Sequence, residues 1–300
     1  MIFAVAGSIF GIRLKQKGVT IAAVDGIPAL SEGDRLISVN GVKVTSGKQV
    51  SDIISKSGGD SVTLKARHKG QDIAIEVKPR VVDGEYRLGL TLRDGAMGIG
   101  TMTYYDPETG EFGGLGHGIC DPDSGEVIEM LSGEVTGALL GGINKGESGK
   151  PGELCGIVTD EICGALSANN GCGVFGKLLC APENARLVEV GTKSELHEGE
   201  ATIISTLKNG KSAEYKIKIY DIDRSSTGSK SFRIKVTDEV LLALTGGIVR
   251  GMSGSPIIQN GKLVGAVTHV MVANPTEGYG IFIENMLNAS NARNELPKAA

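Results

Sequence analysis

The sequence predicts a mainly β protein built in two parts, and three observations support this. Glycine contributes 45 of the 300 residues, roughly twice its average share, and the glycines separate short apolar runs. Many of these runs alternate between apolar and polar residues, which is typical of half-buried strands. After Arg80 the clean alternation gives way to Gly-rich short segments without helical periodicity. We therefore expect one domain over residues 1–82 and a second over residues 83–300.

The first part combines strands with one clear helix. The helix is expected over residues 46–57, because Val50, Ile53 and Ile54 fall on one helical face and Ser46 is a good N-cap. The expected strands lie at residues 10–14, 18–24, 35–39, 42–44, 61–66 and 72–77.

The second part contains many short strands joined by glycine turns, which favours a barrel or a pair of barrels. Clear alternation is found at residues 200–207, 213–220 and 230–236. A further strand is expected over residues 241–249.

Composition excludes several classes of function. Lys and Arg number 31 against 35 Asp and Glu, so the net charge of −4 attracts neither nucleic acid nor anionic lipid. Trp is absent and aromatic residues make up only 4%, which argues against stacking on single-stranded nucleic acid. The longest apolar stretch, residues 1–11, is too short to cross a bilayer core of about 30 Å and lacks the basic start of a signal peptide. We expect no cofactor and no direct membrane span.

The five cysteines are expected to be small buried residues. Cys120 stands alone, and the remaining four follow at intervals of 8, 9 and 8 residues from Cys155 to Cys180. An odd number without close pairs argues against a disulfide framework, and no C-x-x-C pair suggests zinc. We therefore expect no metal site.

The most informative segment is Ile248-Val-Arg-Gly-Met-Ser-Gly-Ser-Pro-Ile-Ile258. It places Ser253 on a turn between two strands with glycine on both sides, where a nucleophilic hydroxyl would be accessible to a carbonyl carbon. The N–H groups of Gly251 and Ser253 are the natural pair to stabilise a developing oxyanion. Ser255 is a rival nucleophile, although alternation turns it toward the wall of the following strand.

A serine nucleophile needs a general base, and His117 is the preferred candidate. It lies in Gly113-Gly-Leu-Gly-His-Gly118, where four glycines imply close backbone packing around one imidazole. His269 is the second candidate. With Thr268 and Val270 it is also expected to form a wall of the substrate pocket.

The residue that would orient the imidazole has several candidates. Asp238 precedes Ser253 by fifteen residues and follows an expected strand, so it is the preferred acid. The alternatives left open by residue chemistry are Glu239, Asp160, Asp221 and Asp223.

The first part resembles a PDZ domain. The resemblance rests on Gly33-Asp-Arg-Leu-Ile-Ser-Val-Asn-Gly41 and on the helix that follows. It implies that peptides bind by strand addition beside a loop whose N–H groups receive a C-terminal carboxylate. That loop would be formed by Phe10, Gly11, Ile12, Arg13 and Leu14. The first strand of the domain looks truncated, so an upstream segment is expected.

The second part resembles chymotrypsin-like double β-barrel peptidases, and the whole chain resembles the SpoIVB peptidase family of endospore-forming bacteria. This narrower resemblance rests on Gly114-Leu-Gly-His-Gly118, on the Ser253 segment continued to Gly261, and on Gly278-Tyr-Gly-Ile-Phe-Ile-Glu284. It implies a serine endopeptidase with Ser253 as nucleophile, His117 as base and Asp238 as the orienting acid.

The family resemblance also implies a biological setting. Family members act outside the cytoplasm, between mother cell and forespore, although no export signal is visible in this chain. They cleave a membrane-anchored regulator of an intramembrane protease, which leads to maturation of a sporulation sigma factor, and they also cleave themselves. The alternative from a different class is a non-catalytic scaffold that binds peptides through its PDZ domain.

Overall fold

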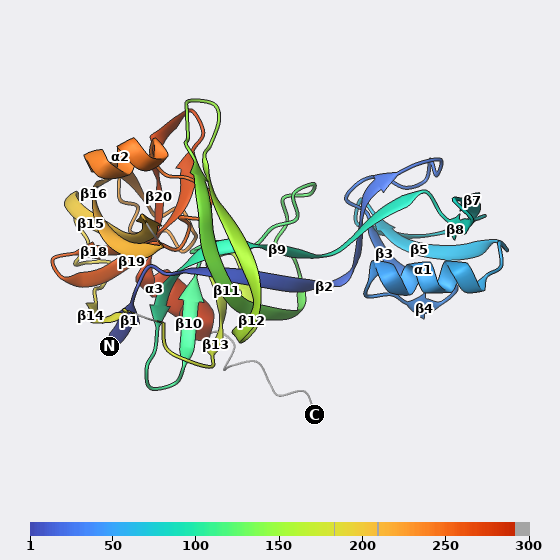
Figure 1. The fold of residues 1–300 in the computed structure, drawn as a ribbon, viewed down its shortest axis with the longest axis horizontal. Coiled ribbons are helices and arrows are strands. Elements are labelled where there is room, and N and C mark those ends of the chain that lie inside the picture. Colours follow the sequence, from blue (N-terminus) through green and yellow to red (C-terminus); the bar gives the residue numbers. More distant parts are fainter. Residues whose placement is uncertain (183, 209, 292–300) are drawn as a thin grey trace. The chain divides into compact units, whose positions relative to one another are not determined.

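The computed structural model describes residues 1–182, 184–208 and 210–291, and most of them are in strands (Figure 1). The chain divides into two compact units. The smaller unit comprises residues 14–96 and 120–132, and the larger unit comprises residues 1–13, 97–119 and 133 onward. This division differs from the predicted boundary at residues 82 and 83. Two long strands, β2 (Ile9–Val24) and β9 (Leu90–Tyr105), contribute residues to both units.

The smaller unit contains a sheet and one helix, largely as predicted. In the sheet β2 pairs with β3, β3 with β4 and β5, and β5 with β6. Helix α1 begins after Ser46, whose hydroxyl accepts a hydrogen bond from the Gln49 N–H at 3.1 Å. The elements are β3 (Arg35–Val39), β4 (Val42–Lys43), α1 (Gly47–Lys56), β5 (Val62–His68), β6 (Gln71–Val77), β7 (Arg80–Val82) and β8 (Glu85–Arg87).

The larger unit contains two closed rings of strands, which together give the predicted double barrel. The first ring runs β9–β10–β13–β12–β11–β2 and returns to β9. The second runs β15–β16–β17–β20–β19–β18 and returns to β15. The first ring adds β10 (Glu111–Gly114), β11 (Met130–Asn144), β12 (Glu153–Asn170) and β13 (Gly173–Leu178).

The second barrel follows the alternation found in the sequence. Its strands are β15 (Gly199–Lys208), β16 (Lys211–Tyr220), β17 (Phe232–Val236), β18 (Pro256–Gln259), β19 (Lys262–Met271) and β20 (Asn274–Phe282). Ile217, Ile234 and Phe232 are among the fully buried side chains of its core. Outside the rings lie β1 (Ile2–Val5), β14 (Arg186–Val190), α2 (Glu239–Thr245) and α3 (Ile283–Asn291).

The strand expected over residues 241–249 was wrong, because this segment begins as helix α2. The Asp238 carboxylate caps the helix by accepting the Leu241 N–H at 3.0 Å. Leu241 and Thr245, one helical turn apart, are its buried residues. Gly246 ends the helix in the left-handed region at φ 74°. The two capping residues, Asp238 and Gly246, therefore mark a helix where the sequence had suggested a strand.

The strand expected at residues 10–14 is confirmed as part of β2. The carboxylate-binding loop that the PDZ resemblance implied for Phe10 to Leu14 was wrong, because all five residues lie inside this strand. Phe10 is buried and packs edge-on against Phe112, with ring centroids 5.7 Å apart. A Cβ at Gly11 would lie 2.2 Å from the Thr136 hydroxyl. Barrel packing therefore holds residues 10–13 as strand, and their N–H groups do not form a loop for a peptide terminus.

The expected burial of the cysteines was wrong as well. None of the five cysteines forms a disulfide; Cys120, Cys155 and Cys180 are exposed, and Cys163 and Cys172 are half-buried. Cys155 and Cys163 lie in a stretch of β12 whose side chains are mostly exposed, and Cys172 lies in the turn that follows this strand. Their small apolar character therefore did not place them in the core.

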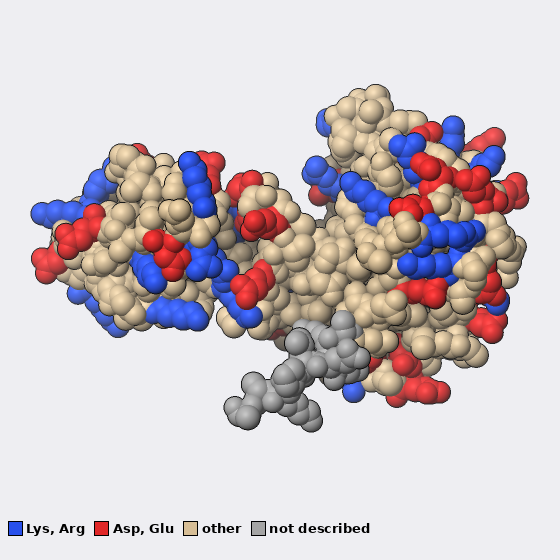
Figure 2. Space-filling view, turned by 180° about the vertical axis from the view of Figure 1, so that it is seen from behind, with Lys and Arg blue, Asp and Glu red and all other residues tan. Residues whose placement is uncertain are grey.

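Two features concern the surface. In the part of the chain that the structure covers, none of the helices has the length and apolar character needed to cross a membrane. Figure 2 shows acidic and basic side chains interspersed over one face of the molecule.

The packing of Phe232 predicts a large loss of stability on truncation. Its ring fills the space beside the Gly265 and Gly280 backbone. Phe232→Ala should lower the free energy of unfolding by about 3–5 kcal/mol, because it removes a fully buried ring from the barrel. Denaturant unfolding monitored by circular dichroism measures this, with the exposed Val240→Ala as control. Equal stability of the two variants would contradict the described core.

Candidate active site

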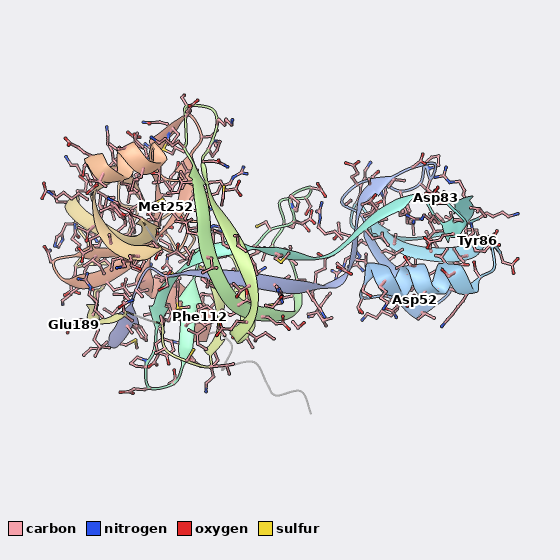
Figure 3. The ribbon with its side chains drawn as sticks, in the orientation of Figure 1. Asp52, Asp83, Tyr86, Phe112, Glu189 and Met252 are labelled. Atoms are coloured by element: carbon pink, nitrogen blue, oxygen red, sulfur yellow. The ribbon has the colours of Figure 1, made fainter. Side chains whose placement is uncertain are left out.

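The turn that carries Ser253 is fixed by backbone hydrogen bonds on both sides. Met252 donates to the Val249 carbonyl at 3.1 Å, and Gly254 donates to the Val267 carbonyl at 2.8 Å. The Met252 side chain is fully buried in the core of the second barrel (Figure 3). An apolar side chain therefore anchors the turn to the barrel interior.

Two threonines of β9, from the first barrel, hold the carbonyl groups of this turn. The Thr101 hydroxyl donates to the Gly251 carbonyl at 2.8 Å, and the Thr101 N–H donates to the Ser253 carbonyl at 3.0 Å. The Thr103 hydroxyl donates to the Gly254 carbonyl at 2.8 Å. Three acceptors of the turn thus have partners, which fixes the orientation of its peptide planes.

The N–H groups of the same turn divide into two sets. Those of Arg250, Met252, Gly254 and Ser255 all donate to backbone carbonyls. Those of Gly251 and Ser253 donate to no acceptor among the described residues. These are the two N–H groups predicted to bind an oxyanion, and a fixed pair of unused donors is the arrangement that such a role requires.

The two serine hydroxyls of the turn have different surroundings. Ser253 is half-buried, and its hydroxyl donates to the Thr268 carbonyl at 2.8 Å. Ser255 is fully buried, and its hydroxyl has no hydrogen-bond partner among the described residues. The rival nucleophile is therefore enclosed by protein, whereas Ser253 is accessible.

His117 lies in the loop after β10, held by tight backbone packing. Leu115 adopts φ 64° and Gly116 φ 70°, and a Cβ at Gly116 would lie 2.8 Å from the Thr268 Cγ2. The His117 Nδ1 is 2.9 Å from the Gly118 carbonyl oxygen. Because that oxygen can only accept, Nδ1 carries the proton and Nε2 of the neutral ring is left as the basic nitrogen.

His269 brings a second imidazole to the same place. Its ring centroid is 4.9 Å from that of His117. Burial, followed by the neighbouring His117 and Lys230, lowers the pKa of His269 to about 4. Burial also lowers the pKa of His117 below its ordinary value of 6.5, opposed by the hydrogen bond to Gly118. Both rings are therefore neutral at pH 7.

The structure thus brings Ser253, Thr268, His269 and His117 together, but the predicted pocket wall is only partly as expected. The Thr268 side chain is buried and donates to the carbonyls of Ser229 and Tyr279. Only its carbonyl oxygen faces the nucleophile. His269 and Val270 are half-buried, and their contact with a substrate remains a prediction.

The structure does not bring Asp238 to this cluster. One carboxylate oxygen accepts the Leu241 N–H, and the other accepts the Lys216 N–H at 3.1 Å. Tyr279 of β20 pairs with His269 of β19 and with Arg233 of β17, so His269 and Arg233 lie at the same level of the sheet. Asp238 lies five residues after Arg233 in the chain. From Arg233 to Val236, the end of β17, the chain rises about 3.3 Å per residue, so Asp238 lies at least roughly 10 Å along the strand direction from the level of His269.

The alternative acids also have other partners. Asp160 pairs with Arg13 at 2.6 Å, and Asp221 pairs with Arg233 at 3.5 Å. Asp223 accepts from Ser225, and Glu239 lies in the first turn of α2. Over the described residues, no group of three or more His, Cys, Asp or Glu side chains is placed to hold a metal ion.

Sequence reasoning missed Thr101 and Thr103. Their signal was present in Gly100-Thr-Met-Thr103, where threonines occupy alternate positions of an otherwise apolar strand. Both are fully buried, so each hydroxyl needed a partner. The sequence alone did not reveal that the partners are carbonyls about 150 residues away along the chain.

The family comparison matches both parts of the chain. The family described as SpoIVB peptidase S55 matches residues 84–287, and a PDZ domain matches residues 21–67. Proteins from Brucella suis and Bartonella henselae, both provisionally named zinc metalloproteases, are 28% and 32% identical over 145 and 79 residues. These matches cover 47% and 26% of this chain. They span only 35% and 22% of the two curated relatives.

Solved structures with detectable similarity include two proteases and a PDZ domain. The Rv3671c protease of M. tuberculosis has a TM-score of 0.40 at 10% identity, covering 68% of this chain and 77% of that one. The HtrA-type protease AlgW with a decapeptide has 0.41 at 12%, covering 97% and 65%. The PDZ domain of an SdrC-like protein from Listeria monocytogenes has 0.24 at 28%, covering 25% and 87%.

The packing at Gly254 predicts that no side chain is tolerated there. A Cβ would lie 1.9 Å from the Thr101 carbonyl oxygen, and the backbone has φ 95°. Gly254→Ala should destabilise the protein by about 3 kcal/mol and abolish reaction of Ser253 with a fluorophosphonate. Gly171→Ala, where the added Cβ would meet no atom within 4 Å, is the matched control. Normal labelling of the Gly254 variant would contradict the described turn.

The lowered pKa of His117 predicts the pH dependence of nucleophile reactivity. A base acts only when unprotonated, so depressing its pKa extends activity to lower pH. The rate of fluorophosphonate labelling should rise with pH and reach half its maximum below pH 6.5, the ordinary value for histidine. Labelling for a fixed time at a series of pH values between about 5 and 8 measures this rate. A midpoint above 6.5 would contradict a buried, neutral base.

Proposed function

Because the chain belongs to the SpoIVB peptidase S55 family, we propose that it cleaves peptide bonds with Ser253 as nucleophile and His117 as general base. The observation that carries this proposal is the turn around Ser253. A half-buried serine hydroxyl lies on a turn with two N–H groups that have no acceptor among the described residues. It donates to the carbonyl of Thr268, the neighbour of His269, whose ring lies beside that of His117. Acyl transfer is the chemistry that uses these groups together.

In the proposed reaction, the Ser253 hydroxyl leaves the Thr268 carbonyl by rotation about its Cα–Cβ bond. It then donates its proton to Nε2 of His117 while Oγ attacks the substrate carbonyl carbon. The N–H groups of Gly251 and Ser253 bind the oxyanion of the tetrahedral intermediate. The imidazolium returns the proton to the leaving amine, and water attacks the acyl-enzyme with His117 again as base.

For the substrate, family resemblance supports a membrane-anchored protein that regulates an intramembrane protease during sporulation. It also supports self-cleavage and an extracytoplasmic location between mother cell and forespore. The PDZ match adds a peptide-binding unit to the same chain, which suits a protease that must select one protein.

Covalent labelling tests the proposed nucleophile directly. A fluorophosphonate should modify the wild-type protein at Ser253, as located by peptide mass spectrometry, and Ser253→Ala should abolish both labelling and cleavage. Ser255→Ala is the matched control and should remain reactive. Failure to label folded wild-type protein would instead favour the non-catalytic, PDZ-containing scaffold.

Asp238 is retained as the proposed orienting acid because the family resemblance supports it. In this structure its carboxylate caps α2, so engagement with His117 requires the segment around the start of α2 to move. Asp238→Asn separates the two roles, because Asn caps helices about as well as Asp. The variant should keep the cap at Leu241 and lose the hydrogen bond from the Lys216 N–H, at a cost of about 1 kcal/mol in stability. It should lose about 10⁴-fold in kcat, as expected for loss of an orienting carboxylate. If the variant retains activity, the imidazole of His117 is oriented by the Gly118 carbonyl, to which its Nδ1 donates, and not by Asp238.

A further inference from the structure

The loop that carries His117 is fixed on both sides of the histidine. Before it, the Leu115 N–H donates to the Thr101 carbonyl at 3.2 Å. After it, the side chain of Asn169, near the end of β12, binds both backbone groups of Ile119. The Asn169 Oδ1 accepts the Ile119 N–H at 2.8 Å, and the Nδ2 donates to the Ile119 carbonyl at 2.9 Å. The imidazole therefore lies between two anchored positions of the backbone.

The peptide unit between Gly118 and Ile119 links Asn169 to this imidazole. Its N–H belongs to Ile119 and donates to Asn169, and its carbonyl belongs to Gly118 and lies 2.9 Å from the His117 Nδ1. Among the described residues no peptide bond is cis, and a trans peptide directs its N–H and C=O to opposite sides. A continuous chain of hydrogen bonds therefore runs from the Asn169 amide through one peptide plane to the ring.

This chain of hydrogen bonds restrains the ring in two ways. A peptide plane whose N–H and C=O are both bonded cannot rotate without breaking one of the bonds, so the Gly118 carbonyl stays directed at Nδ1. Each bond in such a chain also polarises the next, which makes the Gly118 carbonyl a stronger acceptor. Both effects favour the tautomer with its proton on Nδ1, in which Nε2 is the basic nitrogen.

Asn169 is itself held by paired strands. Residue 169 pairs with Val174 in the β12–β13 hairpin, and β13 pairs with β10, the strand that leads into the His117 loop. A Cβ at Gly173 would lie 2.7 Å from the Gly114 carbonyl oxygen, so the end of the hairpin packs directly against the end of β10. The amide therefore has the rigid support that a group positioning a catalytic side chain requires.

We propose that Asn169 is a positioning residue that holds His117 in its productive orientation through the Gly118 carbonyl. This inference rests on the proposed role of His117 as general base. The support acts while Asp238 caps α2, so it does not require the movement proposed for that acid. Loss of the Asn169 amide should therefore disturb both the tautomer of His117 and the reactivity of the nucleophile.

The tautomer can be measured by NMR without any enzymatic turnover. In protein with isotope-labelled histidine at about pH 7, the ring signals of His117 are assigned by their loss in His117→Gln. Wild-type protein should show the neutral form with its proton on Nδ1. Asn169→Ala should show a mixture of both neutral tautomers, because the Gly118 carbonyl is no longer held in place.

Asn170→Ala is the matched control. The Asn170 side chain accepts the Cys172 N–H at 3.0 Å and donates to the Ala289 carbonyl at 3.4 Å. Its truncation therefore also removes two hydrogen bonds to the backbone at the same end of the hairpin, but neither of them involves residue 119. Asn170→Ala should keep the wild-type tautomer and the wild-type rate of fluorophosphonate labelling.

Fluorophosphonate labelling of Ser253 measures the effect on reactivity. Asn169→Ala should lower the maximal labelling rate about 10²-fold, because a small displacement of a catalytic base is costly. The reagent concentration that gives half of this rate should not change, since the oxyanion donors are left in place. Asn169→Asp keeps an acceptor for the Ile119 N–H, so it should retain the Nδ1–H tautomer and label faster than Asn169→Ala.

Three outcomes would overturn the proposal. The first is a wild-type tautomer and labelling rate in Asn169→Ala that is folded by circular dichroism. The second is an equal loss in Asn170→Ala. The third is loss of the Nδ1–H tautomer in folded Asn169→Asp, which decides the matter even where the alanine variant does not fold. If the wild-type protein is not labelled at all, the proposed peptidase function fails, whereas the NMR comparison still decides whether Asn169 orients His117.

Discussion

The contact between Thr101 and the Ser253 turn is the constraint on which the candidate site depends. Through its hydroxyl and N–H, one residue of the first barrel fixes two carbonyls of a turn in the second, and its own carbonyl accepts the Leu115 N–H at 3.2 Å. That last bond ties in the loop that carries His117. With its carbonyls directed toward β9, the turn leaves the Gly251 and Ser253 N–H groups available to bind an anion.

Strand β9, which supplies Thr101, also contributes residues to the smaller unit. The strand that supplies Thr101 and Thr103 begins with the residues that contact β2 and α1 in the smaller unit. One continuous segment therefore contributes to the core of the smaller unit at its start and to support of the nucleophile turn near its end. Glycines at positions 95, 98 and 100 lie between these two parts.

Most local signals in the sequence were read correctly, and most long-range ones were not. The α1 cap at Ser46 and the paired strands around Asn40-Gly41 depend on neighbouring residues, so they could be predicted. The roles of Phe10 and Thr101 depend on partners in distant segments, which no short pattern encodes. For Asp238 the competing local role, capping α2, was itself visible in the sequence but was outweighed by apparent strand character.

The central claim is that the turn presents Ser253 together with two prepared N–H donors, and a crystal structure with a covalent peptidyl phosphonate tests it most directly. The account predicts a bond from phosphorus to the Ser253 Oγ, with the phosphonyl oxygen within hydrogen-bonding distance of the Gly251 and Ser253 nitrogens. A phosphonate attached to another side chain, or an oxygen directed away from both nitrogens, would contradict it.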